Sequence, residues 1–116
     1  MKLAEVDSYN ISLYVGFKER STGRETTIEL AYKLIQEYCD KNGLCVSITP
    51  TKFIYTNGGE NGCIIGFINY PRFPSTKEKI LEHAINIGKI LKENYKQMKV
   101  TLTANDKTIM ISDDDI

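Results

Sequence analysis

Six residues from Cys63 to Ile68, all apolar except Gly66, constrain the fold more than any other part of the chain. A continuous apolar run of this length is typical of a strand that is covered on both faces, so we expect a central strand here. The preceding residues 57–62 combine Asn and Gly in the strongest turn signal of the sequence, which predicts a hairpin with the strand before it. Gly66 would let a helix or another subunit approach this strand closely.

Two capping boxes predict where helices begin. Thr26 precedes Glu29 by three residues, and Ser75 precedes Glu78 in the same way, so each pair can satisfy two free N–H groups at a helix start. After each pair, apolar residues recur at the spacing of one helix face. The two expected helices cover residues 26–42 and about 76–94.

The order of the expected elements, β-α-β-β-β-α-β-β, predicts an α+β fold. Most of its strands follow one another closely, which favours a mostly antiparallel sheet with the two helices as a second layer. We expect a single domain over residues 1–112 and a solvated acidic C-terminal tail over residues 113–116. The six expected strands cover residues 11–17, 44–49, 52–56, 63–68, 98–103 and 108–111.

The charge balance and the cysteines exclude several classes of partner. Formal net charge is zero, with 15 basic and 15 acidic residues. Because affinity for DNA or RNA grows with the number of phosphates neutralised, a nucleic-acid polymer is not expected as a partner. The chain has no signal-peptide core and no apolar run long enough to cross a bilayer, so we expect a cytoplasmic protein that does not bind membranes. The three cysteines lack a CxxC spacing, and neither a metal nor a cofactor is predicted.

Residues 69–75 form a stiff loop between the apolar strand and the second helix. Pro71 and Pro74 fix their own φ angles and push the preceding residues toward extended geometry. Two interpretations are open at this point. The loop either binds a flat anionic molecule through its exposed rings and Arg72, or it is a connector with Phe73 in the core.

Arginine use favours the binding interpretation, although chance placement is the alternative. Only three of the 15 basic residues are arginines, and all three lie in expected loops, where a planar guanidinium suits phosphate recognition. If the two loops met at one end of the sheet, the arginines would converge beside aromatic rings that stack on a base, with Asn69 reading a base edge or a ribose hydroxyl. The candidate ligand-binding residues are therefore Phe17, Arg20, Arg24, Asn69, Tyr70, Arg72 and Phe73.

The sequence offers little that points to catalysis. His83 is the sole histidine and could act as a general base, but it is more simply a surface residue of the second helix. No nucleophile elbow, phosphate-binding loop or Cys–His pair is visible. We therefore expect binding without turnover, and no catalytic residue is assigned.

Four segments resemble a known family. The sequences at 13–16 (Leu-Tyr-Val-Gly), 49–56 (Thr-Pro-Thr-Lys-Phe-Ile-Tyr-Thr), 68–74 (Ile-Asn-Tyr-Pro-Arg-Phe-Pro) and 108–110 (Thr-Ile-Met) are similar to the first family of Thoeris anti-defence proteins of phages and prophages. The resemblance implies a sponge that binds glycocyclic ADP-ribose, a signal made by TIR enzymes in the host bacterial cytoplasm, without cleaving it. It also implies a homo-oligomer, a dimer or higher. None of that family's binding residues is transferred to this chain.

Two other functions stay open beside the sponge. One is an enzyme that degrades a cyclic nucleotide signal, with His83 or a loop acid assisting. The other is an inhibitor that binds a defence enzyme through an exposed sheet edge or the flank formed by Ile85 and Ile90. Gly66, Gly88 and these extra isoleucines suggest apolar surface beyond what one domain can bury, which again favours an oligomer.

Overall fold

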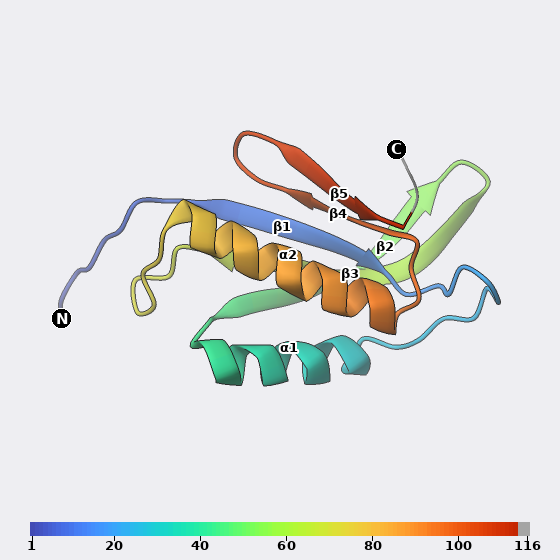
Figure 1. The fold of residues 1–116 in the computed structure, drawn as a ribbon, viewed down its shortest axis with the longest axis horizontal. Helices are drawn as coiled ribbons and strands as arrows, with labels where there is room; N and C mark the ends of the chain where they lie inside the picture. Colours follow the sequence, from blue (N-terminus) through green and yellow to red (C-terminus); the bar gives the residue numbers. More distant parts are fainter. Residues whose placement is uncertain (114–116) are drawn as a thin grey trace.

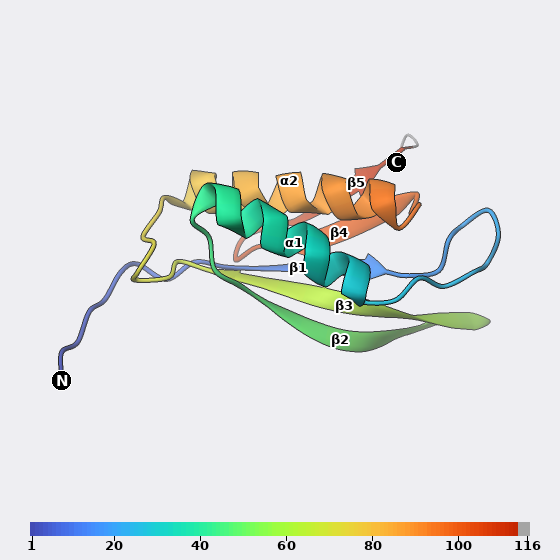
Figure 2. The same cartoon turned by 90° about the horizontal axis from the view of Figure 1, so that it is seen from below.

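A computed structural model describes residues 1–113 and contains one sheet with two helices on the same face (Figures 1 and 2). The α+β, two-layer prediction is confirmed. In chain order the elements are β1 (Asn10–Gly16), α1 (Glu29–Asn42), β2 (Val46–Tyr55), β3 (Gly58–Ile68), α2 (Lys77–Asn94), β4 (Lys99–Thr103) and β5 (Thr108–Ser112).

The sheet has five strands in the order β2-β3-β1-β4-β5, and every neighbouring pair is antiparallel. Leu13 of β1 lies opposite Ile65 on one side and Leu102 on the other. All three side chains are fully buried beneath the helices. The central strand is therefore β1, and β3 lies next to it.

Residues 46–55 form one strand of 10 residues, where the sequence predicted two strands separated at Pro50. The pairing with β3 runs unbroken through the position where Pro50 lies opposite Cys63. This is possible because β2 is an edge strand. At an edge, a proline is tolerated where an ordinary residue would direct its backbone N–H to solvent, because no hydrogen bond of the sheet is then lost. The predicted count of six strands was therefore wrong by one.

The apolar run in β3 is covered on one face only, which corrects the expectation of two covered faces. Cys63, Ile65 and Phe67 are buried under the helices, whereas Ile64 is half-buried and the side chain of Ile68 is exposed. The run is apolar on both sides, but the helices lie on only one of them (Figure 2).

We call the other side of the sheet the open face. It is lined by the residues of β1 and β3 that alternate with the buried ones, such as Tyr14 and Ile64, and by their partners in the outer strands. The ring of Phe53 from β2 meets Tyr14 edge-on, with 6.5 Å between ring centroids. A Cβ added to Gly62 would collide with the Phe53 ring, so glycine is needed where that ring crosses β3.

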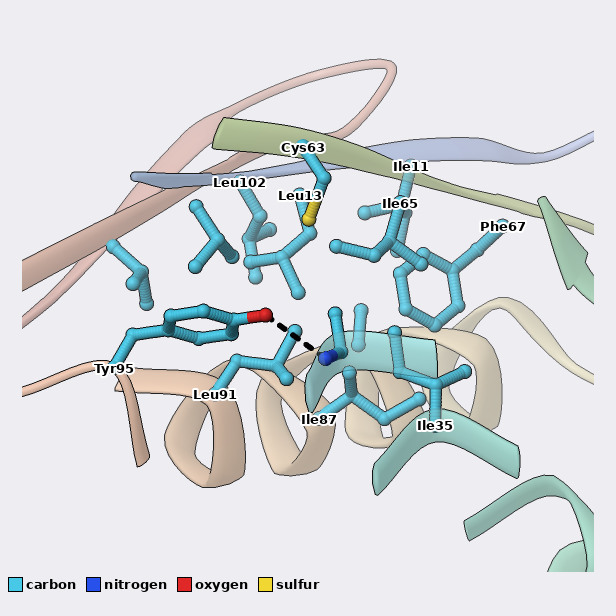
Figure 3. Close-up of a cluster of buried hydrophobic side chains, with 14 of the residues drawn as sticks. Ile11, Leu13, Ile35, Cys63, Ile65, Phe67, Ile87, Leu91, Tyr95 and Leu102 are labelled. Atoms are coloured by element: carbon cyan, nitrogen blue, oxygen red, sulfur yellow. Dashed lines mark hydrogen bonds between the residues drawn. The ribbon is translucent and has the colours of Figure 1, made fainter. Parts of the chain in front are cut away.

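The core holds both helices to the sheet, and the buried Tyr95 lies at one end of the cluster drawn in Figure 3, beside Leu91 of α2. Its hydroxyl accepts a hydrogen bond from the Ala31 N–H at 2.9 Å and donates one to the Thr27 carbonyl at 2.7 Å. Burial raises the pKa of this phenol to about 12. One hydroxyl beyond the end of α2 thus fixes the beginning of α1.

Both predicted capping boxes are replaced by other arrangements. The N-cap of α1 is Ile28, which makes no side-chain cap, and that of α2 is Thr76, whose hydroxyl accepts from the Lys79 N–H at 3.1 Å. The predicted end of the first helix is correct: Gly43 has φ of 62° and takes the left-handed conformation.

Asp113 belongs to the folded domain, although the sequence predicted it as the start of a solvated tail. Its carboxylate pairs with the ammonium of Lys92, whose side chain is only 8% exposed, and its N–H donates to the Met98 carbonyl. The remaining residues of the predicted tail, 114–116, lie outside the described residues.

Candidate ligand-binding site

Asn69 fixes the loop between β3 and α2. Its amide nitrogen donates to the Asp7 carbonyl at 2.8 Å, and its amide oxygen accepts from the Ser75 N–H at 2.9 Å. The backbone N–H of Asn69 also donates to the Tyr9 carbonyl at 3.2 Å. Asn69 therefore shapes the loop, with one hydrogen bond at each end of its carboxamide. Its role in reading a base edge stays a prediction.

The loop presents a stack of two rings and a guanidinium. Tyr70 and Phe73 have ring centroids 6.3 Å apart and planes inclined by 29°, and the Arg72 guanidinium carbon lies 5.8 Å from the Phe73 centroid. Phe73 is 40% exposed, which is incompatible with the alternative of a ring buried in the core. Of the predicted site residues, these three are brought together on the surface.

A cavity of about 320 Å³ lies beside this stack, and we call it the loop pocket. Tyr70 and Phe73 form one wall and residues 42–45 at the end of α1 form another. Lys79 and His83 line it from α2. No Asp or Glu lines the pocket, so its polar groups are one ammonium, one imidazole and neutral donors or acceptors.

His83 is buried and has specific partners, whereas the sequence suggested an ordinary surface histidine. It is 8% exposed, and its Nδ1 lies 2.7 Å from the hydroxyl of Tyr38 on α1. The amide nitrogen of Asn86 donates to the same hydroxyl at 3.3 Å. Burial, reinforced by the nearby charge of Lys79, lowers the pKa of His83 below 6.5, so the imidazole is neutral at pH 7.

The two arginine-bearing loops lie at opposite ends of the sheet, so the predicted convergence is wrong within one chain. Asn10 at the beginning of β1 pairs with Ile68, directly before the 69–75 loop, whereas Gly16 at its other end leads into residues 18–25. Figure 1 shows these loops at the two extremes of the molecule. Antiparallel pairing causes this, because β1 ends where β3 begins.

The other predicted residues occupy different surroundings. Phe17 is 4% exposed and stacks on Tyr95 with 4.7 Å between centroids, so its faces are used by the core. Arg20 lines a cavity of about 400 Å³ together with Glu60, which accepts a hydrogen bond from the Lys18 N–H at 2.8 Å. Arg24 lines a third cavity of about 370 Å³.

Sequence reasoning missed the polar side of the loop pocket. Lys79 and His83 lie four residues apart and hence on one face of a helix, a signal that was available. Tyr38, which orients His83, lies 45 residues away in sequence, and only the fold brings the two together.

Within residues 1–113, no cluster of three or more His, Cys, Asp or Glu side chains could hold a metal. Neither helix in this part of the chain has the length and apolar character needed to cross a membrane.

No protein-family model and no curated protein matches the chain. Among solved structures, a phage SAM lyase in complex with S-methyl-5'-thioadenosine has a TM-score of 0.79 and 20% sequence identity, covering 97% of this chain and 95% of that chain. A phage SAM lyase in its apo state has a TM-score of 0.78 and 20% identity, covering 93% of this chain and 91% of that chain.

The expectation that the chain is not an enzyme is overturned by this likeness, because the fold is that of an enzyme along almost its whole length. The expectation rested on the assumption that an enzyme shows a recognisable nucleophile, general acid or general base in its sequence. Catalysis by positioning of the reacting atoms leaves no such motif, so the lack of one does not exclude an enzyme. The chain shares its two-layer α+β fold with phage SAM lyases.

Proposed function

We propose that this chain is a phage anti-defence protein that binds S-adenosylmethionine in the loop pocket and cleaves it to S-methyl-5'-thioadenosine. The observation that carries the proposal is the fold shared with a phage SAM lyase that holds S-methyl-5'-thioadenosine. The volume of the loop pocket, about 320 Å³, falls within the range of about 300–1,000 Å³ of small-molecule sites. The protein would act in the cytoplasm of the host bacterium, where this substrate is made.

The chemistry of this substrate suits a pocket without a strong acid or base. The sulfonium leaves as a neutral thioether when its bond to the γ-carbon of the methionine portion breaks, and the electron pair stays on sulfur. A carboxylate oxygen of the same molecule can form the new bond to that carbon, closing a lactone, so neither water nor a proton is consumed. The protein must hold the carboxylate and the γ-carbon in line, and correct positioning alone can supply about 7–11 kcal/mol of barrier lowering.

The walls of the pocket offer what the two ends of the molecule require. Tyr70 and Phe73 present exposed faces on which adenine can stack, at about 1–3 kcal/mol per base. The same faces attract the sulfonium through cation–π interaction. Lys79 supplies a positive charge on the opposite side for an acidic group.

A second candidate is that the pocket binds glycocyclic ADP-ribose, the ligand that the family resemblance implies. The Arg72 guanidinium over the Phe73 ring favours it, because an arginine beside a stacking surface suits a molecule with a base and a diphosphate.

We also propose that the chain forms a homo-oligomer through the open face. Tyr14, Phe53 and Ile64 give this face an apolar centre, and Met110 of β5 adds a side chain that is 40% exposed. An apolar sheet face without helices is the kind of surface that subunits bury. A second subunit could then bring Arg20 or Arg24 toward the loop pocket of the first.

The proposed reaction is tested by incubating the purified protein with S-adenosylmethionine and quantifying S-methyl-5'-thioadenosine by mass spectrometry. Phe73→Ala should lower product formation at least tenfold, because the base loses its stacking surface. Ile54→Ala is the matched control, since Ile54 is 83% exposed on the β2–β3 hairpin and touches none of the pocket.

Glycocyclic ADP-ribose is examined in parallel by heating the complex and analysing the supernatant. Release of the ligand by wild-type protein but not by Arg72→Ala would favour the second candidate. A protein that yields no thioadenosine and retains neither ligand would reject both, and a stoichiometric protein partner in a pull-down would then favour an inhibitor of a defence enzyme.

A further inference from the structure

One ring nitrogen of the buried His83, which lines the loop pocket, has no hydrogen-bond partner among residues 1–113. His83 is more than nine-tenths buried, yet among residues 1–113 its Nε2 makes no hydrogen bond to protein. In that part of the chain, only the Tyr9 hydroxyl is a side-chain polar atom that has neither solvent contact nor a hydrogen-bond partner. Because Nε2 of His83 also has no partner, it must be in contact with solvent. His83 is one of the residues that line the loop pocket.

The hydrogen bond between Tyr38 and His83 couples the tautomer of the imidazole to the direction of the Tyr38 hydroxyl hydrogen. Asn86 donates to the Tyr38 hydroxyl at 3.3 Å, so that oxygen already serves as an acceptor. Its hydrogen is then available to the Nδ1 of His83, 2.7 Å away. When Nδ1 accepts this hydrogen, the neutral imidazole carries its own hydrogen on Nε2, and we take this tautomer as the basis of the inference.

A positive charge lies on the same face of the helix. Lys79 is one helical turn before His83, near the N-terminal end of α2, and both side chains line the loop pocket. The ion pair of Lys79 with Glu82 is 3.5 Å long and solvent-exposed on both sides, a type that contributes little stability and is easily exchanged. Glu82 is not part of the pocket wall, so an anion that enters meets Lys79 and His83 without an opposing carboxylate.

We propose that the Nε2–H of His83 and the ammonium of Lys79 bind the carboxylate of the amino-acid portion of the substrate, with Tyr38 and Asn86 as positioning residues. This inference rests on the proposed function, and it adds a specificity for substrates with a carboxylate over nucleosides without one. Holding one carboxylate oxygen leaves the other free to attack the γ-carbon. The burial that lowers the pKa of His83 maintains the neutral donor form.

The first measurement concerns the free protein and needs no ligand. Long-range ¹H–¹⁵N correlation spectra of the His83 ring report which nitrogen is protonated. We expect the Nε2–H tautomer in the wild type and a mixture of tautomers in Tyr38→Phe, which removes the hydroxyl donor. A wild-type spectrum of the Nδ1–H tautomer would overturn the inference.

The second measurement compares two ligands by calorimetry. S-adenosylmethionine has the carboxylate, whereas S-methyl-5'-thioadenosine shares the nucleoside but lacks it. His83→Leu and Lys79→Met should each weaken binding of S-adenosylmethionine at least tenfold and leave binding of the thioadenosine within twofold. His83→Gln, whose amide can donate from a similar position, should restore most of the loss.

The outcomes separate the inference from the proposed function. If wild-type protein binds neither ligand, the proposed function fails, and the carboxylate site for this substrate fails with it. If wild-type protein binds both but His83→Leu weakens both equally, His83 only supports the fold and the carboxylate site is rejected. The same conclusion follows if Lys79→Met leaves both affinities unchanged.

Discussion

Tyr95→Phe isolates the energy of the hydroxyl that joins the two helices. The substitution keeps the ring, so burial of apolar surface and the stack on Phe17 are preserved. It removes the acceptor for the backbone N–H of Ala31, a fully buried residue in the first turn of α1. The N-cap residue Ile28 makes no side-chain hydrogen bond that could replace it. It also removes the donor to the carbonyl of Thr27, an exposed residue that water can reach.

The expected loss follows from this asymmetry. An unsatisfied buried polar group costs about 1–3 kcal/mol, and only the Ala31 N–H is placed where water cannot replace the lost bond. We therefore expect the free energy of unfolding to fall by about 1–3 kcal/mol, measured by urea denaturation with circular dichroism.

Tyr55→Phe is the matched control, because Tyr55 is 50% exposed and its hydroxyl makes no hydrogen bond within residues 1–113. The control should stay within about 0.5 kcal/mol of wild type, as surface changes usually do. A Tyr95→Phe variant as stable as the control would refute the argument that this hydroxyl substitutes for a local cap on α1.

Three further changes test other parts of the structure. The pKa of His83 is lower in the folded protein than the ordinary value of 6.5, so the stability that depends on the neutral imidazole is present above pH 6.5 and is lost as pH falls toward the folded-state pKa. His83→Gln has no group that titrates in this range. The variant should therefore lose this part of the pH dependence in urea denaturation measured between pH 7 and pH 5. Gly62→Ala should destabilise the protein by about 1–3 kcal/mol in urea denaturation at pH 7, since the new methyl group meets the Phe53 ring and the Val15 carbonyl. A urea midpoint equal to that of wild type would contradict this. If wild-type protein forms the proposed oligomer in light scattering, Ile64→Glu should convert it to monomer without altering the circular dichroism spectrum. An unchanged mass would exclude the open face as the interface.

The fold class could be predicted from the sequence because the strong periodic segments coincide with real elements. The apolar run at Cys63–Ile68 lies in a strand, and Gly43 ends a helix. The hairpin predicted from residues 57–62 is present, but its turn is shorter than predicted, because residues 58–62 already pair with β2 as the beginning of β3. Each of these depends on neighbours in sequence, which is the information that a local pattern contains.

Features that depend on distant contacts were missed. Whether Pro50 interrupts a strand depends on that strand being an edge, and whether Ile64 is covered depends on which face the helices occupy. Replacement of a local cap by Tyr95, 64 residues away from Ala31, has no signature near either residue.

The candidate site was predicted in part for the same reason. The stiff loop with Tyr70, Arg72 and Phe73 was identified from its own residues. In the structure Tyr70 and Phe73 line a cavity, and the Arg72 guanidinium lies over the Phe73 ring. The polar wall was not identified, because the pairing of Tyr38 with His83 joins two helices that are far apart in the chain. The role of all these residues in ligand binding stays a prediction.

Pro50 also restricts how other chains can associate with this one. The outer edge of β2 is an unpaired row of backbone groups, and such edges are templates for strand addition by a partner or by misfolded copies. A proline near the middle of this edge removes one donor from the row and places a ring in the path of an incoming strand. Continuous pairing along β2 is therefore disfavoured, which opposes growth into extended sheets through this edge.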